Sequence, residues 1–272
     1  MAKHRAKWSL RRYHKLISEG RGQGTLKDYK PWITIHDIAS KGMSSRIPGR
    51  TTGRIHHTLS NLETAFFYIL DASKKVFDIR EQYPLLPVTD TVRIAEQAGI
   101  RHPRDTVSRY PYVMTTDFVI TTGRGIVARS IKQSSELEKP RVREKLEIER
   151  RYWKEKEVDW RLVTETEIDF QKARNLEWVY RSWYYYDMLP EGKDSRQIEA
   201  FFLDNYNGSC LSVAEIALRT EERFSLLPGL GMTTFQHLIL EDRIELDLSR
   251  PIDLVTVRGW EGGDRSWIAM YA

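Results

Sequence analysis

The sequence predicts a mixed α/β domain followed by a smaller, mainly helical domain, and three observations support this division. First, Met114–Lys132 carries strand-like segments on either side of the glycine-containing turn Thr122–Gly125, which predicts a β-hairpin. Second, residues 141–157 predict a long helix with apolar positions near one face, and a short apolar strand follows at 160–165. Third, the chain after residue 168 is mainly helical. Since a helix between two strands is typical of a parallel crossover, the sheet should be mixed.

The segments before the hairpin supply another helix and another strand. Leu59–Leu70 has apolar residues at helical spacing, and Ser60 is a natural N-cap. Val76–Pro84 predicts a strand that ends at a proline, and a further helix is expected within 91–97. The resulting order of helix, strand, strand, strand, helix and strand predicts an α/β sheet with helices on its faces.

The second domain is predicted to span residues 169–272. After an aromatic connector, helices are expected within 195–206, 211–224 and the first part of 232–248, which should end in a strand. This order suits a winged helix or another helix-turn-helix variant. However, the last helix and strand carry four acidic residues against one arginine, a balance that opposes phosphate binding: Glu241, Asp242, Glu245, Asp247 and Arg243. We therefore expect this domain to bind a protein rather than DNA.

Composition and charge place the chain among soluble globular proteins. Hydrophobic residues make up 40% and charged residues 30% of the sequence. The longest apolar run, Ala65–Leu70, is far shorter than the roughly 20 residues that span a bilayer. The basic start leads into no apolar segment, so no signal peptide is expected. The single cysteine, Cys210, excludes an internal disulfide and is expected to be a small buried residue. Together these features predict a cytoplasmic protein.

The charge is unevenly distributed along the chain. Residues 1–168 contain 32 Lys and Arg against 21 Asp and Glu, a net charge of +11. Residues 169–272 contain 11 against 17, a net charge of −6. A basic half of this kind favours a polyanionic partner such as nucleic acid.

The hairpin could gather residues with catalytic chemistry. Alternation places Asp117 on one strand opposite about residue 129 or 130, so Asp117, Ser130 and Lys132 could cluster at one end of the sheet. Glu63 could reach the same end from the first helix. Oxygen ligands for Mg²⁺ beside a cation are what a metal-dependent phosphodiesterase needs. From spacing alone, however, a plain Asp117–Lys132 salt bridge is favoured, and Ser60 with Glu63 also matches a capping box.

Other polar residues are weaker candidates. His56 and His57 follow Arg54, and this group could contact phosphate or simply lie on the surface. The charges of the long helix should mostly form solvated pairs, with Lys145 and Glu149 as candidates for a second shell around the site.

Several motifs, in this order, resemble the TnsA family of transposon endonucleases over about residues 20–165: GRGQGTLKDYKPW, TGRIHHTLSNLE, FDIREQYPLLP, MTTDFVI and REKLEIERRYW. The resemblance implies a restriction-endonuclease-like fold for residues 1–168, with a PD-(D/E)xK-type site. It also implies Mg²⁺-dependent hydrolysis at the 5′ ends of a transposon, with Mn²⁺ able to substitute. The implied partners are transposon-end DNA, the DDE transposase TnsB and the AAA+ regulator TnsC, the last through residues 169–272.

The resemblance also assigns roles to residues. It makes Glu63, Asp117 and Lys132 catalytic, and it implies that the metal is held by Glu63, Asp117 and the backbone carbonyl of Ile131. The candidates for DNA contact are Arg54, His56, His57 and Arg80.

One position departs from the family pattern. The residue two before the lysine often is glutamine in this family, and here it is Ser130, a weak ligand or one that acts through water. Two alternatives therefore stay open: a noncatalytic assembly subunit with a degenerate site, and a free-standing restriction or repair nuclease of the same fold.

Overall fold

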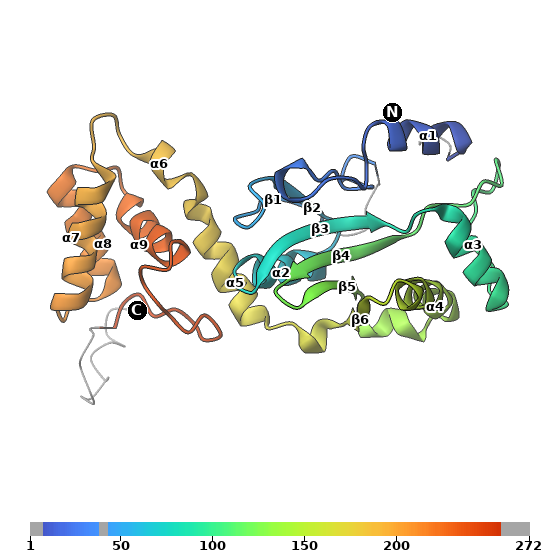
Figure 1. The fold of residues 1–272 in the computed structure, drawn as a ribbon. Helices are drawn as coiled ribbons and strands as arrows, with labels where there is room; N and C mark the ends of the chain where they lie inside the picture. Colours follow the sequence, from blue (N-terminus) through green and yellow to red (C-terminus); the bar gives the residue numbers. More distant parts are fainter. Residues whose placement is uncertain (1–7, 38–42, 257–272) are drawn as a thin grey trace. The chain divides into compact units, whose positions relative to one another are not determined.

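The computed structural model describes residues 8–37 and 43–256, and the chain divides into two compact units, Met1–Ala173 and Arg174–Ala272. The helices of the first unit are α1 (Leu10–Ser18), α2 (Asn61–Asp71), α3 (Val88–Gln97) and α4 (Pro140–Glu155). The strands are β1 (Ser45–Pro48), β2 (Ile55–Thr58), β3 (Val76–Pro84), β4 (Thr115–Thr122), β5 (Gly125–Ile131) and β6 (Asp159–Val163). Figure 1 shows these elements in the blue-to-yellow part of the chain.

The central sheet has the order β3-β4-β5-β6 and is mixed, as the sequence predicts. β3, β4 and β5 pair antiparallel, whereas β5 and β6 pair parallel. Because parallel neighbours require a crossover, α4 connects them, which confirms the predicted connection. A separate antiparallel ribbon, β1–β2, lies near β3 and was not predicted (Figure 1).

Helices cover both faces of the sheet. On one face, Val119 and Ala128 pack with residues of α3 and α4 such as Ile94 and Ile148 in a fully buried core. On the other face, Phe118 of β4 contacts Phe66 of α2, with ring centroids 5.8 Å apart. Neighbouring residues of β4 thus face opposite sides of the sheet, with Val119 toward α4 and Phe118 toward α2.

The second unit consists of helices: α5 (Phe170–Val179) begins in the first unit, and α6 (Tyr185–Met188), α7 (Ser195–Gly208), α8 (Val213–Phe224) and α9 (Leu230–Leu240) follow. Ser212 and Glu215 form the predicted capping box of α8. The predicted strand after α9 is wrong, because residues 241–248 form turns and irregular backbone without a partner strand. The described part of this unit, up to residue 256, thus has no strand that could serve as a wing. Cys210 is exposed, which corrects the expectation that it is buried.

Within the described residues, no helix is long and apolar enough to cross a membrane.

Candidate active site

Asp117 and Lys132 form an ion pair at the end of the β4–β5 hairpin. The ammonium Nζ of Lys132 lies 2.8 Å from Asp117 Oδ2 and 2.7 Å from the carbonyl oxygen of Ile131. The same Oδ2 also accepts a hydrogen bond of 2.7 Å from the backbone N–H of Ile131. The pairing of Phe118 with Arg129 sets Asp117 opposite Ser130, so the predicted register is confirmed. The salt bridge expected from spacing is present, and it leaves Asp117 Oδ1 without a hydrogen bond from any described residue.

Glu63 lies in the first turn of α2 and makes the contacts of a helix cap. Its carboxylate accepts hydrogen bonds from the backbone N–H of Leu59 at 2.9 Å, from the hydroxyl of Ser60 at 2.8 Å and from the amide of Gln82 at 3.2 Å. Because Oε1 accepts only one of these, it keeps a lone pair for another partner. The capping role and a ligand role are therefore compatible.

Ser130 is directed toward a third carboxylate, that of Glu149 on α4. The Ser130 hydroxyl donates to Glu149 Oε1 and accepts from the indole N–H of Trp160 at 3.0 Å. Thr116 also donates to Glu149 Oε1 and accepts from the indole of Trp153 at 2.7 Å. The serine thus orients a glutamate that reaches the hairpin from a different element.

The three carboxyl groups outnumber the cations around them. Burial, together with the charge of Asp117, raises the pKa of Glu63 to about 7. The same two causes, in the same order, raise the pKa of Glu149 to about 7. Burial opposes the charge of Lys132, but the neighbouring carboxylates Asp117, Glu149 and Glu63 raise its pKa above the usual value. The cluster therefore has a deficit of positive charge that a bound cation would remove.

The donor atoms suit a hard divalent cation. Asp117 Oδ1, Glu63 Oε1 and the Ile131 carbonyl are oxygen donors, the type that Mg²⁺ prefers. Within residues 8–37 and 43–256, however, no three His, Cys, Asp or Glu side chains converge closely enough to hold a metal by themselves. Backbone oxygen and water would have to complete the coordination, which Mg²⁺ tolerates because it retains waters readily.

Two of the residues predicted to contact DNA are buried in a different cluster. The guanidinium of Arg54 donates to both carboxylate oxygens of Glu81, at 2.8 and 2.5 Å. His56 is fully buried, with Nδ1 2.8 Å from Glu81 and Nε2 2.7 Å from the hydroxyl of Thr52. The charges of His56 and Arg54 outweigh the effect of burial and hold the pKa of Glu81 far below its usual value. We therefore correct the prediction for Arg54 and His56, which serve this internal network instead.

The other two candidates are only partly accessible. Burial, which exceeds the opposing effect of Glu81, lowers the pKa of His57. Arg80 lies 3.3 Å from Asp78 and above the ring of Tyr83, and its side chain is 12% exposed. Neither geometry supports a major role in phosphate contact.

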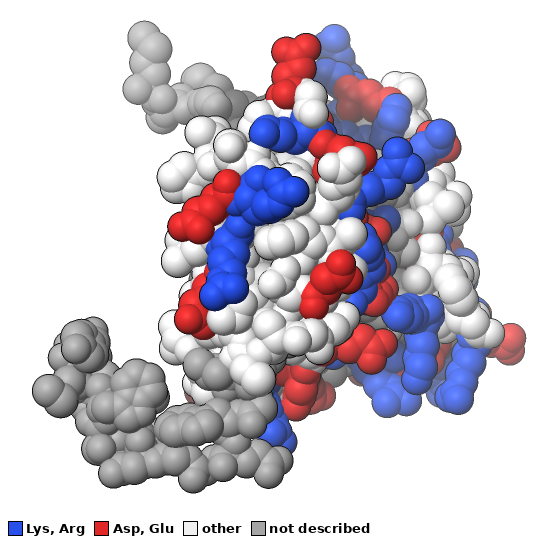
Figure 2. Space-filling view, turned by 90° about the vertical axis from the view of Figure 1, so that its left-hand side faces the viewer, with Lys and Arg blue, Asp and Glu red and all other residues white. Residues whose placement is uncertain are grey.

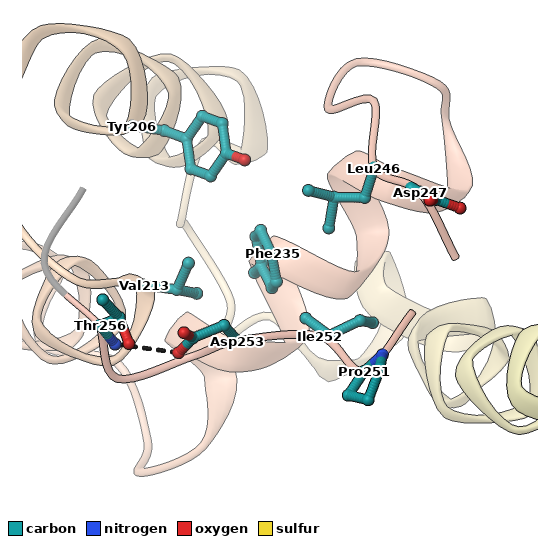
Figure 3. Close-up of a pocket in the computed structure, with 9 residues that line it drawn as sticks. All are labelled: Tyr206, Val213, Phe235, Leu246, Asp247, Pro251, Ile252, Asp253 and Thr256. Carbon is teal, nitrogen blue, oxygen red and sulfur yellow. Dashed lines mark hydrogen bonds between the residues drawn. The ribbon is translucent and has the colours of Figure 1, made fainter. Parts of the chain in front are cut away.

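The second unit offers a recess of different character. A cavity of about 280 Å³ is lined by apolar side chains from α7, α8 and α9, and by the segment that follows α9 (Figure 3): Tyr206, Val213, Phe235, Leu246, Pro251 and Ile252. Its charged lining residues are Asp247 and Asp253, so it lacks a group that would attract phosphate. The side of the molecule seen in Figure 2 mixes acidic and basic side chains around an uncharged area.

The spacing of apolar residues around Glu149 in the sequence already indicates that this carboxylate is buried. Leu146, Glu149 and Trp153 are spaced three and four residues apart, so Glu149 lies on the buried face of α4. A carboxylate at an apolar position of a helix needs a partner, and here Ser130 and Thr116 supply it. By contrast, Glu147 forms the solvated pairs expected on this helix, with Arg150 and Arg151.

Comparisons with known proteins agree with this architecture. Residues 73–165 match the family model of the TnsA-like endonuclease N-terminal domain, and residues 167–248 match that of the TnsA endonuclease C-terminal domain. Asp117, Ser130, Lys132 and Glu149 lie within the first match, and Glu63 precedes it. The transposition protein TnsA of transposon Tn7 from Escherichia coli is 44% identical over 183 residues, which cover 66% of this chain and 66% of that protein.

Proposed function

Because this chain belongs to the TnsA family of transposon endonucleases, we propose that it is the metal-dependent nuclease subunit of a heteromeric transposase. It would hydrolyse phosphodiester bonds at the 5′ ends of the transposon during cut-and-paste transposition, with Mg²⁺ or Mn²⁺ as cofactor. The single observation that carries this proposal is the cluster of Glu63, Asp117 and Glu149 around one cation, Lys132. Such a deficit of positive charge is typical of a site that binds a cation.

Each residue has a separate role in this proposal, within a PD-(D/E)xK-type site. Glu63, Asp117 and the carbonyl of Ile131 would hold the metal, which lowers the pKa of water and stabilises charge on phosphate oxygens. Lys132 remains protonated in the acidic cluster, so its ammonium can position water or stabilise the developing negative charge. Glu149 adds negative charge beside Asp117 and is oriented by Ser130.

The alternative of a noncatalytic assembly subunit finds less support. It rests on Ser130, but this serine has a buried and fully bonded place between Glu149 and Trp160. A site in decay would not be expected to retain such a network.

The test is in vitro transposition with TnsB and TnsC, in which 5′ and 3′ strand cleavage are measured separately. Asp117→Ala and Glu63→Ala should abolish 5′ cleavage while the 3′ cuts by TnsB continue, so that the product changes from clean excision to a cointegrate. Arg124→Ala, at the exposed tip of the hairpin, is the matched control and should cut normally. If Asp117→Ala cuts 5′ strands at the normal rate, the assigned site is wrong.

We also propose that the second unit binds a protein partner, the AAA+ regulator TnsC. The net charge of −6 after residue 168 opposes DNA, and α8 and the loop after it expose Leu218 and Leu227. In a pull-down with the full-length chain, Leu218→Ser with Leu227→Ser should reduce retention of TnsC and leave 5′ cleavage by pre-assembled complexes unchanged. Unaltered retention would contradict this assignment.

A further inference from the structure

A second basic feature of the first unit lies outside the carboxylate cluster. The loop after α3 and the start of α4 enclose a cleft of about 480 Å³, lined by Arg101, His102, Pro103, Arg104, Arg141, Glu144 and Lys145. Four of these side chains are cationic and one is a carboxylate, so the lining carries a net charge of +3 while His102 is neutral. The lining contains no Phe, Tyr or Trp, and the imidazole of His102 is buried, so no aromatic ring is exposed for a base to stack on.

The cations of this cleft are largely unpaired. The side chains of Arg101 and Lys145 are exposed and form no hydrogen bond or ion pair with the residues that the structure describes. Arg104 donates only a long hydrogen bond of 3.4 Å to the backbone carbonyl of Arg109. Arg141 is the exception, since its guanidinium lies 2.6 Å from Glu144. Elsewhere on α4, Arg150 and Arg151 both form ion pairs with Glu147.

Hydrogen bonds of His102 hold the loop that forms one wall of the cleft. His102 is buried, with Nε2 3.0 Å from the hydroxyl of Thr91 on α3 and Nδ1 2.9 Å from the carbonyl of Pro103. Burial lowers its pKa to about 4, so the imidazole is neutral at pH 7 and adds no charge to the cleft. Since both ring nitrogens are engaged, the loop that carries Arg101 and Arg104 is fixed relative to α3.

The cleft is electrostatically linked to the catalytic cluster. Burial, followed by the charges of Arg141 and Lys132, lowers the pKa of Lys145. The ammonium of Lys145 thus repels the guanidinium of Arg141 in the cleft and the ammonium of Lys132 in the catalytic cluster. An anion in the cleft would relieve this repulsion. Lys145 also lies about one turn of α4 before Glu149, which links the cleft to the carboxylate cluster through a single helix.

We propose that this cleft binds a backbone phosphate of the DNA strand being cut, next to the scissile phosphate. The inference rests on the proposed nuclease function, because it takes the ligand to be the substrate of that site. The absence of a stacking residue in the lining favours the sugar–phosphate backbone over a free nucleotide. The arginine forks and the lysine suit phosphate oxygens.

The test measures DNA binding separately from cleavage. Full-length protein carrying Asp117→Ala is titrated, in EDTA, against a fluorescent 30-base-pair duplex at several salt concentrations. Adding Arg101→Ala and Lys145→Ala should raise Kd about tenfold or more and reduce the slope of log K against log salt by about 1 to 2. The matched control removes two exposed cations distant from the cleft in sequence, Arg124→Ala with Lys154→Ala, and should change Kd less than threefold.

Two further arms separate the alternatives. Lys145→Arg should restore most of the affinity lost in Lys145→Ala, which a merely structural role would not require. Inorganic phosphate and a nucleoside triphosphate should raise the melting temperature only weakly. If the cleft variants bind the duplex like the control, or if only the small anions depend on Arg101 and Lys145, the proposal is overturned. Loss of duplex binding in the cleft variants of a protein that proves unable to cut DNA would support the cleft as a site for a DNA backbone phosphate and would overturn only its assignment to the strand being cut.

Discussion

The first unit contains two buried clusters of charged residues that differ in charge balance. In one, the carboxylate of Glu81 is matched by Arg54 and His56 at 2.5–2.8 Å. In the other, Glu63, Asp117 and Glu149 share a single cation, Lys132. The pKa of Glu81 is held well below its usual value, whereas the pKa values of Glu63 and Glu149 are raised to about 7.

This difference distinguishes a structural network from the network that we propose to be catalytic. A matched buried carboxylate ties β2 to β3 and has nothing left to offer a ligand. An unmatched cluster costs folding free energy unless a further cation arrives, so its retention is best explained by function. Four substitutions can break or sharpen this comparison.

The largest effect is expected from Lys132→Ala. Removing the only cation of the unmatched cluster should lower the rate of 5′ cleavage at least about a thousandfold, or roughly 4 kcal/mol of barrier. Transposition reactions that score both strands would measure this, with 3′ cleavage by the partner transposase as the internal control. A loss of less than tenfold would mean that Lys132 only balances charge.

The second prediction concerns the matched cluster. Glu81→Gln leaves Arg54 and His56 without a buried counter-charge, so the free energy of unfolding should fall by about 3 kcal/mol. Urea denaturation of the metal-free protein would measure it. Glu155→Gln, which breaks an exposed pair with Arg93, is the control and should leave the urea midpoint almost unchanged. Equal losses in the two variants would contradict the distinction between the clusters.

Replacing a carboxylate of the unmatched cluster by an amide, as in Glu149→Gln, should instead raise the free energy of unfolding. A carboxyl with a raised pKa holds its proton more tightly in the folded chain, so stability is lost as pH rises from about 4.5 to about 7. Glu149→Gln has no such proton to lose. The variant should therefore match the natural protein near pH 4.5 and exceed its unfolding free energy above pH 7, by on the order of 3 kcal/mol.

This comparison requires urea denaturation in EDTA at pH 5 and pH 8, because a bound cation would remove the effect. Cleavage by Glu149→Gln should nevertheless fall, by about tenfold or more. If the difference in unfolding free energy were the same at both pH values, ionisation of Glu149 would not destabilise the folded protein.

The smallest effect is expected from Ser130→Ala. The hydroxyl orients Glu149 and accepts from Trp160, so its loss should reduce 5′ cleavage by no more than about tenfold, or 1.4 kcal/mol. A loss of Mg²⁺ affinity that accompanies the slower cleavage would be measured by titrating Mg²⁺ in the cleavage reaction. A thousandfold loss would instead make the hydroxyl a necessary ligand.

The parts of the site that were predictable depend on local pattern. The hairpin turn and the period of a strand suffice to set Asp117 opposite Ser130, and a helix start suffices to give Glu63 its capping contacts. The family resemblance then supplied the expectation that Glu63 has a second role. The mixed sheet followed because a helix between strands requires a crossover.

What failed depends on contacts between distant segments. Arg54 and His56 meet Glu81 across more than twenty residues, and nothing near them in the sequence reveals that partner. The apolar alternation of Ile244, Leu246 and Leu248 resembles a strand, but a strand needs a neighbour to pair with. Here the side-chain amide of Asn175 donates instead to the backbone carbonyls of Leu248 and Arg250.

The helix α4 carries both Lys145 of the basic cleft and Glu149 of the catalytic cluster. Four residues of α-helix separate them, a rise of about 6 Å along a rod that is a single covalent piece. If the cleft binds a phosphate of the strand, the rigid helix α4 fixes the distance between that phosphate and the phosphate that is hydrolysed. No hinge movement would then change this distance. The nuclease would then cleave at a fixed distance from the bound phosphate, independently of the neighbouring base sequence.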